Sequence, residues 1–221
     1  EILRCLVGSE MCIRDSLKYC SEEDFELRVF YNNACTIKGQ KIIKKPIEYL
    51  KPEATKAILS AFVGDTVKHR RNRMILILMY DSGCRVQEIA DLKVSSLHLD
   101  VRNPYMTVIG KGRKTRNVPL TRKTVLHLKN YLTEFHEESK DEYLFYSFLD
   151  NKPHQLSTDS IALILKQAAK IAKERCALVP DRVHCHMLRK TKAMDLYKDG
   201  VPLPFICLLY TSPSPRDISG S

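Results

Sequence analysis

Long apolar runs are missing from this chain of 221 residues. The longest uninterrupted run of hydrophobic side chains covers residues 74–80, whereas a helix that spans a membrane needs roughly 20 apolar residues. We therefore expect no transmembrane segment and no membrane partner. Hydrophobic residues make up 44% of the chain and charged residues 28%, which is typical of a protein that folds around a core and excludes extensive disorder.

Cysteine pairs with the spacing of a metal site are also missing, although the chain has eight cysteines. No C-x-x-C segment occurs, and no His-x-x-x-His segment is present to complete a zinc site. A disulfide framework is typical of shorter, secreted chains. We therefore interpret the cysteines as reduced thiols of a cytoplasmic protein and expect no metal site.

Acidic side chains are absent from residues 101–133, a segment that carries eight basic residues. The whole chain has 36 Lys and Arg against 26 Asp and Glu, which gives a formal net charge of +10. Positive charge that gathers in one segment favours a polyanionic partner, above all nucleic acid. The alternative is a surface charge that merely keeps the protein in solution.

The two ends of the chain differ in character from the rest. Residues 7–16 (VGSEMCIRDS) and 208–217 (LLYTSPSPRD) resemble translated sequencing-adapter reads of the kind found at the edges of assembled coding sequences. The alternative is a pair of native tails, and the Ser-Pro repeat of the second segment folds poorly in either case. We expect residues 1–16 and 207–221 to be non-native tails on a chain shortened at both ends.

Helical patterns dominate the remaining sequence. Residues 72–80 are apolar almost all round, which predicts a buried helix that Ser82 and Gly83 end. Residues 105–109 and 115–120 are β-rich and flank a glycine-containing loop, which predicts a hairpin. Further helices are predicted from Ser21, from Pro52 to Phe62, over 86–92, from Thr121 to about His136, from Ser157 or Thr158 to Arg175, and over about 185–198. The predicted fold class is mainly α with a small antiparallel β-sheet (α+β).

Four residues have the chemistry to hold a phosphate group. Arg85 lies two residues beyond the glycine that ends the buried helix, so it can project from a rigid support; the structural alternative is an ion pair with Glu88. His186 and Arg189 are three residues apart and share one helical face, although a solvated helix surface explains this spacing equally well. Lys111 lies at the tip of the predicted hairpin, where a lysine on its own more often serves solubility.

Three segments occur in an order that makes the interpretation more specific: SGCRVQEIADL (82–92), VIGKGRKTRNVPL (108–120) and HMLRKTKAMDLYKDG (186–200). Together they resemble the catalytic domain of the tyrosine recombinases, the phage integrase family. The resemblance covers about residues 46–206, and residues 17–45 are similar to the end of the family's smaller DNA-gripping domain with its linker. It implies a tyrosine recombinase catalytic-domain fold, incomplete at the C-terminus.

The resemblance also implies a role for each candidate. In this family two arginines, a lysine, one or two histidines and a tyrosine cut and rejoin double-stranded DNA through a covalent phosphotyrosine intermediate, without a metal or another cofactor. Matched residue by residue, the catalytic set here is Arg85, Lys111, His186 and Arg189. The two guanidiniums can clamp phosphate oxygens, Lys111 can protonate the leaving 5′ oxygen, and His186 can position or deprotonate the nucleophile.

The same resemblance implies contacts outside the catalytic set. Three basic residues of the hairpin are expected to follow the DNA backbone, which gives an affinity that falls with salt: Arg113, Lys114 and Arg116. The family also implies self-association into a multimer on DNA.

The last residues depart from the family pattern. After Ile206 the family continues to a Leu-Gly-His segment and, on a later helix, to the nucleophilic tyrosine, and neither is present. Tyr210 follows Arg189 too closely to be that nucleophile. We therefore expect the parent protein to be a site-specific recombinase or integrase, and this chain to bind DNA without cleaving it. The alternatives are a non-catalytic DNA-binding regulator on the same scaffold and a nuclease, for which the carboxylate cluster that holds Mg²⁺ is missing near the hairpin.

Overall fold

The computed structural model describes residues 16–36, 48–110, 114–136, 142–149 and 152–210. The chain divides into two compact units, Glu1–Pro46 and Ile47–Ser221, called unit 1 and unit 2 below. The end of the segment 17–45, where the linker is expected, lies outside the described residues, as does most of both predicted tails. Each unit is described by itself.

Unit 1 is helical over the residues that the structure describes. A helix over residues 16–23 is followed by the 3-10 helix η1 (Phe25–Leu27) and by α2 (Arg28–Thr36). Ser21 lies inside the first helix, where its hydroxyl donates to the carbonyl oxygen of Lys18 at 2.7 Å, so the prediction that Ser21 begins a helix was wrong. Asp24 has the capping role instead, because its side chain accepts a hydrogen bond from the Glu26 backbone N–H at 2.9 Å.

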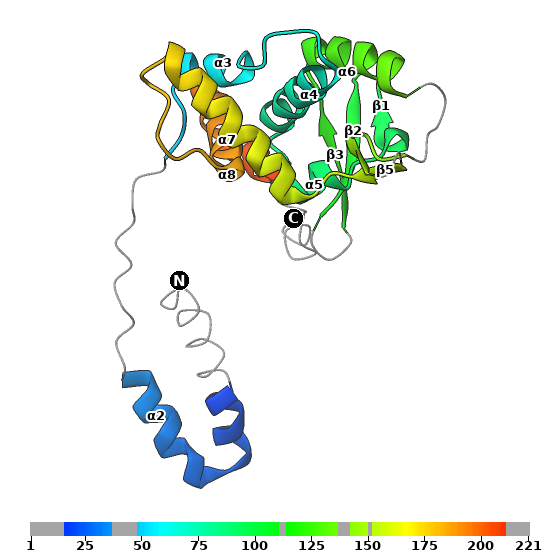
Figure 1. Ribbon diagram of the computed structural model, residues 1–221. Helices are drawn as coiled ribbons and strands as arrows, with labels where there is room; N and C mark the ends of the chain where they lie inside the picture. The colour runs from blue at the N-terminus through cyan, green and yellow to red at the C-terminus, as the bar shows by residue number, and fades with distance from the viewer. Residues whose placement is uncertain (1–15, 37–47, 111–113, 137–141, 150–151, 211–221) are drawn as a thin grey trace. The chain divides into compact units, whose positions relative to one another are not determined.

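Helices form most of unit 2, which confirms the predicted fold class. They are α3 (Pro52–Leu59), α4 (Val67–Ser82), α5 (Val86–Ala90), η2 (Val94–Ser96), α6 (Arg122–Phe135), α7 (Thr158–Arg175), α8 (Cys185–Lys198) and α9 (Leu203–Tyr210). Pro52 takes the first position of α3, and Thr121 and Ser157 cap α6 and α7 with their side-chain oxygens, as predicted. In Figure 1, α4 packs against α6 and α8, while α3 packs against α7.

The predicted hairpin is present and belongs to a three-stranded antiparallel sheet. Strands β1 (Leu97–His98), β2 (Tyr105–Ile109) and β3 (Thr115–Pro119) lie in the order β1-β2-β3. Val108 pairs with Arg116 and Met106 with Val118, and all four side chains are buried on the same face. A second hairpin, β4 (Tyr146–Leu149) with β5 (Lys152–Gln155), was not predicted.

The core of unit 2 gathers around α4, whose residues Ile75, Leu76 and Leu78 have no exposed surface. This burial confirms the prediction that the helix is covered almost all round, although α4 begins at Val67, five residues before the predicted start at residue 72, with Thr66 as its cap. Apolar side chains from the sheet and from α6 and α7, such as Met106, complete the same cluster. The cluster therefore gives α4, α5 and α8 a fixed mutual arrangement.

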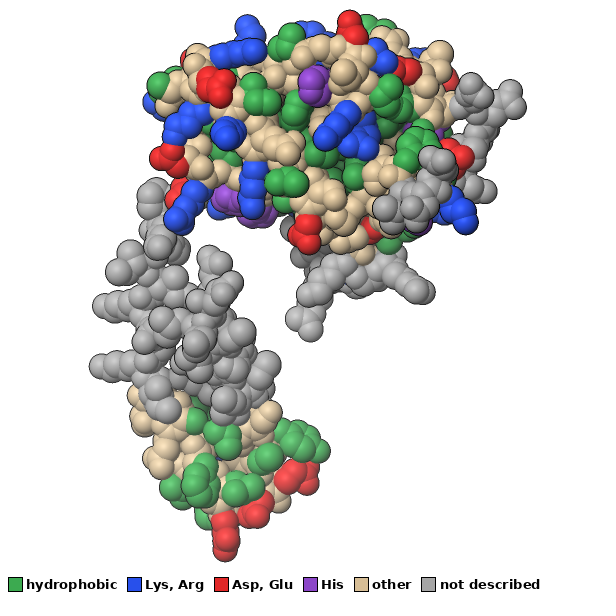
Figure 2. Space-filling view, in the orientation of Figure 1, with side chains coloured by type: hydrophobic (Ala, Val, Ile, Leu, Met, Phe, Trp, Pro, Cys, Tyr) green, Lys and Arg blue, Asp and Glu red, His purple; other side chains and the backbone are tan. Residues whose placement is uncertain are grey.

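Charge is distributed differently over the two units. Lys and Arg side chains are spread over the face of unit 2 that Figure 2 shows. In unit 1, acidic side chains gather at one end of the described part in the same view, and the exposed ones are Glu22, Glu23, Asp24 and Glu26. Among the described residues, no helix is both long and apolar enough to cross a membrane.

Candidate active site

Arg85 projects from a sharp turn between α4 and α5. Gly83 ends α4 in the left-handed conformation, with φ of 57° and ψ of 24°, which glycine adopts without the steric cost of a Cβ. Cys84 is buried after it, and Arg85 then takes the N-cap position of α5 in an extended conformation. The turn thus fixes the Arg85 backbone while its side chain remains half exposed.

Glu88 forms an ion pair with Arg85, which is the alternative to phosphate binding that the sequence left open. Its carboxylate accepts from the Arg85 backbone N–H at 2.8 Å and from Arg85 Nη1 at 3.1 Å. The same carboxylate also accepts from Arg116, with Nη1 at 2.7 Å from Oε1 and Nη2 at 2.8 Å from Oε2. One negative charge is therefore shared by two guanidiniums, and Arg85 is not neutralised.

The Arg116 pairing keeps a buried carboxylate ionised. Burial alone favours the protonated form of Glu88, but hydrogen bonds from Arg116 and from the Arg85 backbone lower its pKa to about 2. The Glu88 carboxylate in turn raises the pKa of Arg116. Burial raises the pKa of the neighbouring Cys84 thiol to about 11, so this sulfur is neutral at physiological pH.

Arg189 reaches the same turn from α8. It is 7% exposed, and its Nη1 donates to the carbonyl oxygen of Gly83 at 2.6 Å. Burial lowers the pKa of Arg189, and the positive charge of Arg85 lowers it further. Two guanidiniums whose positive charges meet at one turn attract an anion.

His186 lies one turn before Arg189, with an exposed imidazole. Burial of part of the ring lowers its pKa below 6.5, and the positive charges of Lys190, Arg189, His184 and Arg85 act in the same direction. The ring is therefore neutral at physiological pH and able to accept a proton. The structure brings three of the four predicted catalytic residues together, whereas Lys111 lies outside the described residues.

The hairpin residues expected to contact DNA differ in their placement. Arg113 lies outside the described residues. On either side of residues 111–113, the Gly110 N–H donates to the Lys114 carbonyl oxygen at 2.8 Å. Lys114 is exposed. Arg116 is 8% exposed and directed into the protein, so its expected position on the DNA-facing surface is wrong. The reason is its place on β3: alternate side chains of a strand share a face, and Arg116 shares the buried face with Val118.

A basic cavity of about 650 Å³ lies apart from the Gly83 turn, between α7 and the segment that leads into α8. Its positively charged or titratable side chains come from both elements: Lys166, Lys170, Lys173, Arg182 and His184. Asp181 also lines it and pairs with Lys173. Sequence reasoning missed this cluster, although lysines at 166, 170 and 173 have the spacing of one helical face.

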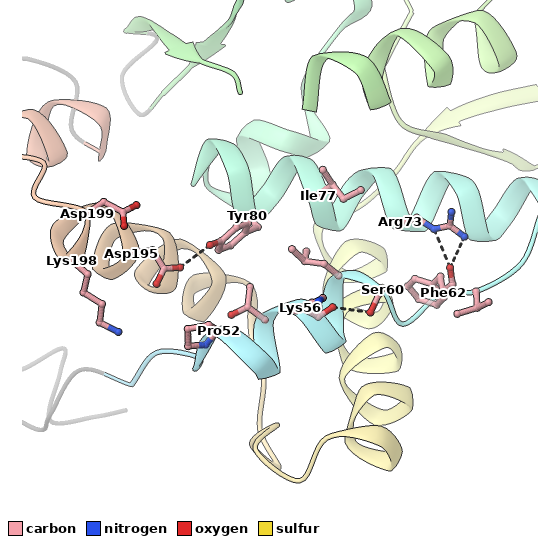
Figure 3. Close-up of a pocket in the computed structure, with 13 residues that line it drawn as sticks. Pro52, Lys56, Ser60, Phe62, Arg73, Ile77, Tyr80, Asp195, Lys198 and Asp199 are labelled. Atoms are coloured by element: carbon pink, nitrogen blue, oxygen red, sulfur yellow. Dashed lines mark hydrogen bonds between the residues drawn. The ribbon is translucent and has the colours of Figure 1, made fainter. Parts of the chain in front are cut away.

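A cavity of about 860 Å³ between α3, α4 and α8 has a different character (Figure 3). Arg73 is engaged there by the Phe62 carbonyl oxygen, at 2.6 Å from Nη2, and Tyr80 donates to Asp195 at 2.7 Å. Asp195 and Asp199 offset Lys56 and Lys198 on its wall, so this cavity attracts a phosphate less than a site with basic side chains alone. We therefore place the candidate site at the Gly83 turn and not in this cavity.

The side chains of the candidate site are mainly cationic. In the part of the chain that the structure describes, no group of three or more His, Cys, Asp or Glu side chains could hold a metal ion. The site instead combines Arg85, Arg189 and Arg116 with one carboxylate, that of Glu88, and a neutral imidazole. Sequence reasoning treated Glu88 only as a competitor for Arg85 and missed its contact with Arg116.

Comparison with known proteins gives a family for this arrangement. The phage integrase family matches residues 48–210. A tyrosine recombinase of Pseudothermotoga lettingae is 31% identical over 165 residues, which cover 75% of this chain and 52% of that protein. Tyrosine recombinase XerA of Pyrococcus furiosus is 27% identical over 183 residues, covering 82% of this chain and 59% of XerA. The chain thus spans between half and three fifths of the length of these relatives.

Solved structures agree with this relationship at the level of the fold. The crystal structure of XerA recombinase superimposes with a TM-score of 0.60 at 22% identity, covering 87% of this chain and 70% of that one. XerH site-specific recombinase bound to its difH substrate gives a TM-score of 0.61 at 23% identity, covering 80% of this chain and 50% of that one. The fold class is confirmed by these neighbours. With the family match extending over most of unit 2, this chain belongs to the phage integrase family.

Proposed function

We propose that this chain is part of a site-specific DNA recombinase or integrase and that its candidate site binds the phosphodiester group to be cut. The observation that carries the proposal is the meeting of Arg85 and Arg189 at the Gly83 turn, with the Glu88 carboxylate already shared by Arg116. The resulting excess of positive charge suits the negative charge that phosphoryl transfer gathers on the non-bridging oxygens.

The side chains divide the chemistry between them. Arg85 and Arg189 hold the non-bridging oxygens with planar, bidentate donors that a lysine cannot supply. In the parent recombinase, the hydroxyl of a tyrosine outside this chain attacks phosphorus and loses its proton with help from His186, whose lowered pKa leaves the imidazole neutral. The P–O5′ bond then breaks, and Lys111 supplies the proton that the 5′ oxygen takes up.

DNA is the partner that the surroundings of this site support. XerH was solved bound to its difH substrate, and an integrase of transposon Tn1549 was solved with circular intermediate DNA, so neighbours of this fold act on DNA. In this chain, Lys114, Arg113 and the basic cavity beside α7 supply cations for the backbone phosphates. Self-association on DNA belongs to the same proposal.

DNA binding is tested by fluorescence anisotropy with a duplex over a series of salt concentrations. We expect the logarithm of the affinity to fall linearly with the logarithm of the salt concentration. Arg85→Met and Arg189→Met should each weaken binding of inorganic sulfate, a tetrahedral dianion that stands in for the phosphate. A duplex affinity that does not change with salt, or a sulfate affinity that neither variant changes, contradicts the proposal.

Cleavage is tested separately, because we propose that this chain binds DNA without cutting it. The chain is incubated with nicked duplexes, in which a cut releases a short strand and traps any covalent protein–DNA adduct. We expect no adduct. An adduct that Tyr210→Phe abolishes would show that Tyr210 is the nucleophile, whereas cleavage that a chelator abolishes would indicate a metal-dependent nuclease.

A further inference from the structure

Arg116 has a burial and a pairing that DNA contact does not explain. Its side chain is 6% exposed and lies on the inward face of β3. Both terminal nitrogens are directed at Glu88, and Nη2 also lies 3.8 Å from the sulfur of Cys84. Its Nε is buried without a hydrogen-bond partner among the described residues. Arg116 therefore contacts the site from the interior of the protein, through Glu88.

Stability alone does not account for such a pair. A buried ion pair is often no more stable than two apolar side chains of similar volume, because the desolvation of both charges offsets their attraction. The pair does fix geometry, since two parallel hydrogen bonds leave the Glu88 carboxylate a single orientation. In that orientation, Oε2 accepts from the Arg85 backbone and Oε1 from the Arg85 side chain.

We infer that Arg116 is a positioning residue: through Glu88 it holds Arg85 in the orientation that receives the phosphate. The inference rests on the proposed function, because it concerns the same anion site. The chain of contacts runs from β3 through Glu88 to the N-terminus of α5, and so links the strand that begins at Thr115 to Arg85. Arg116 itself does not touch the substrate.

The charged and titratable groups around Glu88 come from three parts of unit 2. Arg85 and Arg116 contact it directly, Arg189 lies beside them on α8, and Cys84 is a neutral thiol. Removing Arg116 leaves the burial of Glu88 opposed by the contacts with Arg85 and by the positive charge of Arg189. The carboxyl of Glu88 should then take up a proton at a much higher pH than in the native chain.

Three variants separate positioning from simple charge, with sulfate as the probe. Binding is followed by NMR at the arginine Nε–Hε signals, at constant ionic strength. Glu88→Met removes a negative charge, so a charge effect alone predicts tighter sulfate binding, whereas loss of positioning predicts weaker binding. The double variant Glu88→Met/Arg116→Met has the native net charge, and replacing both members of a buried pair by apolar side chains preserves folding in comparable cases.

We expect both Glu88→Met and the double variant to bind sulfate at least about fivefold more weakly than the native chain, a loss of about 1 kcal/mol by the standard relation between affinity and free energy. Arg116→Lys should bind sulfate more weakly than the native chain but more tightly than the double variant, because a lysine retains the charge but not the bidentate geometry. Arg102→Met, in the connection between β1 and β2, is the matched control and should bind as the native chain does. Native affinity in the double variant overturns the inference.

A second measurement reports on Glu88 directly. The carboxyl carbon of Glu88 is followed by NMR during a pH titration and identified by its loss in Glu88→Gln. In Arg116→Met we expect its pKa to rise clearly from about 2, because the two hydrogen bonds from Arg116 that oppose burial are lost. A pKa that stays near 2 overturns the inference whatever the sulfate results. If Arg85→Met leaves native sulfate binding unchanged, the proposed function fails instead, and the Glu88 titration still decides whether Arg116 orders the carboxylate.

Discussion

Arg189 Nη1 donates a hydrogen bond of 2.6 Å to the carbonyl oxygen of Gly83, although the two residues are 106 positions apart in the chain. The bond joins α8, which carries His186, to the turn that carries Arg85. A guanidinium has five N–H donors, so Arg189 can make this contact and still offer donors to an anion. The second arginine of the site therefore also fixes the position of the first.

Arg189→Met should lower the free energy of unfolding by about 1–3 kcal/mol, because the Gly83 carbonyl loses a charged donor in a buried setting. Urea denaturation followed by circular dichroism measures the change. Arg175→Met, which removes an exposed arginine at the end of α7, is the matched control and should cost less than about 0.5 kcal/mol. Equal losses in the two variants would mean that the Gly83 contact adds nothing.

The lowered pKa of Glu88 makes stability depend on pH in acid. A carboxyl whose pKa falls from 4.5 to about 2 on folding contributes stability above pH 4.5 and loses it as the pH falls toward 2. Between about pH 6 and pH 3 the native chain should lose about 2 kcal/mol more than Glu88→Gln, which cannot titrate there. Urea denaturation at a series of pH values tests this, and parallel curves for the two proteins would contradict it.

His186 should titrate below 6.5, because burial and the neighbouring positive charges disfavour its protonated form. The imidazole Cε1–H signal in NMR gives the pKa of His186. Lys190→Gln should raise this pKa toward 6.5, because it removes the positive charge that lowers the pKa most. Lys198→Gln, on the last turn of the same helix, serves as the control and should leave it unchanged. A pKa at or above 6.5 in the native chain is the contrary result.

Thr191→Val should destabilise unit 2 by about 1–3 kcal/mol, since it keeps the shape of the side chain and removes its hydroxyl. That hydroxyl is fully buried and accepts from the Leu50 backbone N–H at 2.9 Å, which would be left without a partner. Thr191→Ser keeps the acceptor and loses only a methyl group, so it should cost about 1 kcal/mol. Urea denaturation compares the two, and a smaller loss for Val than for Ser refutes the prediction.

Elements with a strong local signal were predictable from the sequence. Pro52 begins α3, Thr121 caps α6, and Gly83 ends α4, and each of these residues acts through its own backbone geometry or its nearest neighbours. The β4–β5 hairpin was missed because its strands have only four residues each and depend on pairing with one another rather than on propensity. The helix start predicted at Ser21 was wrong because a serine hydroxyl can donate to a carbonyl oxygen inside a helix as well as cap the start of one.

The site was predictable as a set of residue types but not as a network. The spacing of His186 and Arg189 places both on one face of α8, and the structure brings that face to the Arg85 turn. Counting charges in residues 101–133 could not show on which side of a strand each charge lies. The alternation of β3 was the available signal, because Arg116 is in phase with the apolar Val118.

The hydrogen bond between Leu50 and Thr191 has a structural consequence. Leu50 lies just after the start of unit 2, and Thr191 lies on α8, two residues after Arg189. The chain is thus bonded to α8 before it begins α3. The backbone that precedes α3 and the helix that carries His186 and Arg189 are therefore held together through one backbone amide, so the position of α8 depends on a residue outside the site itself.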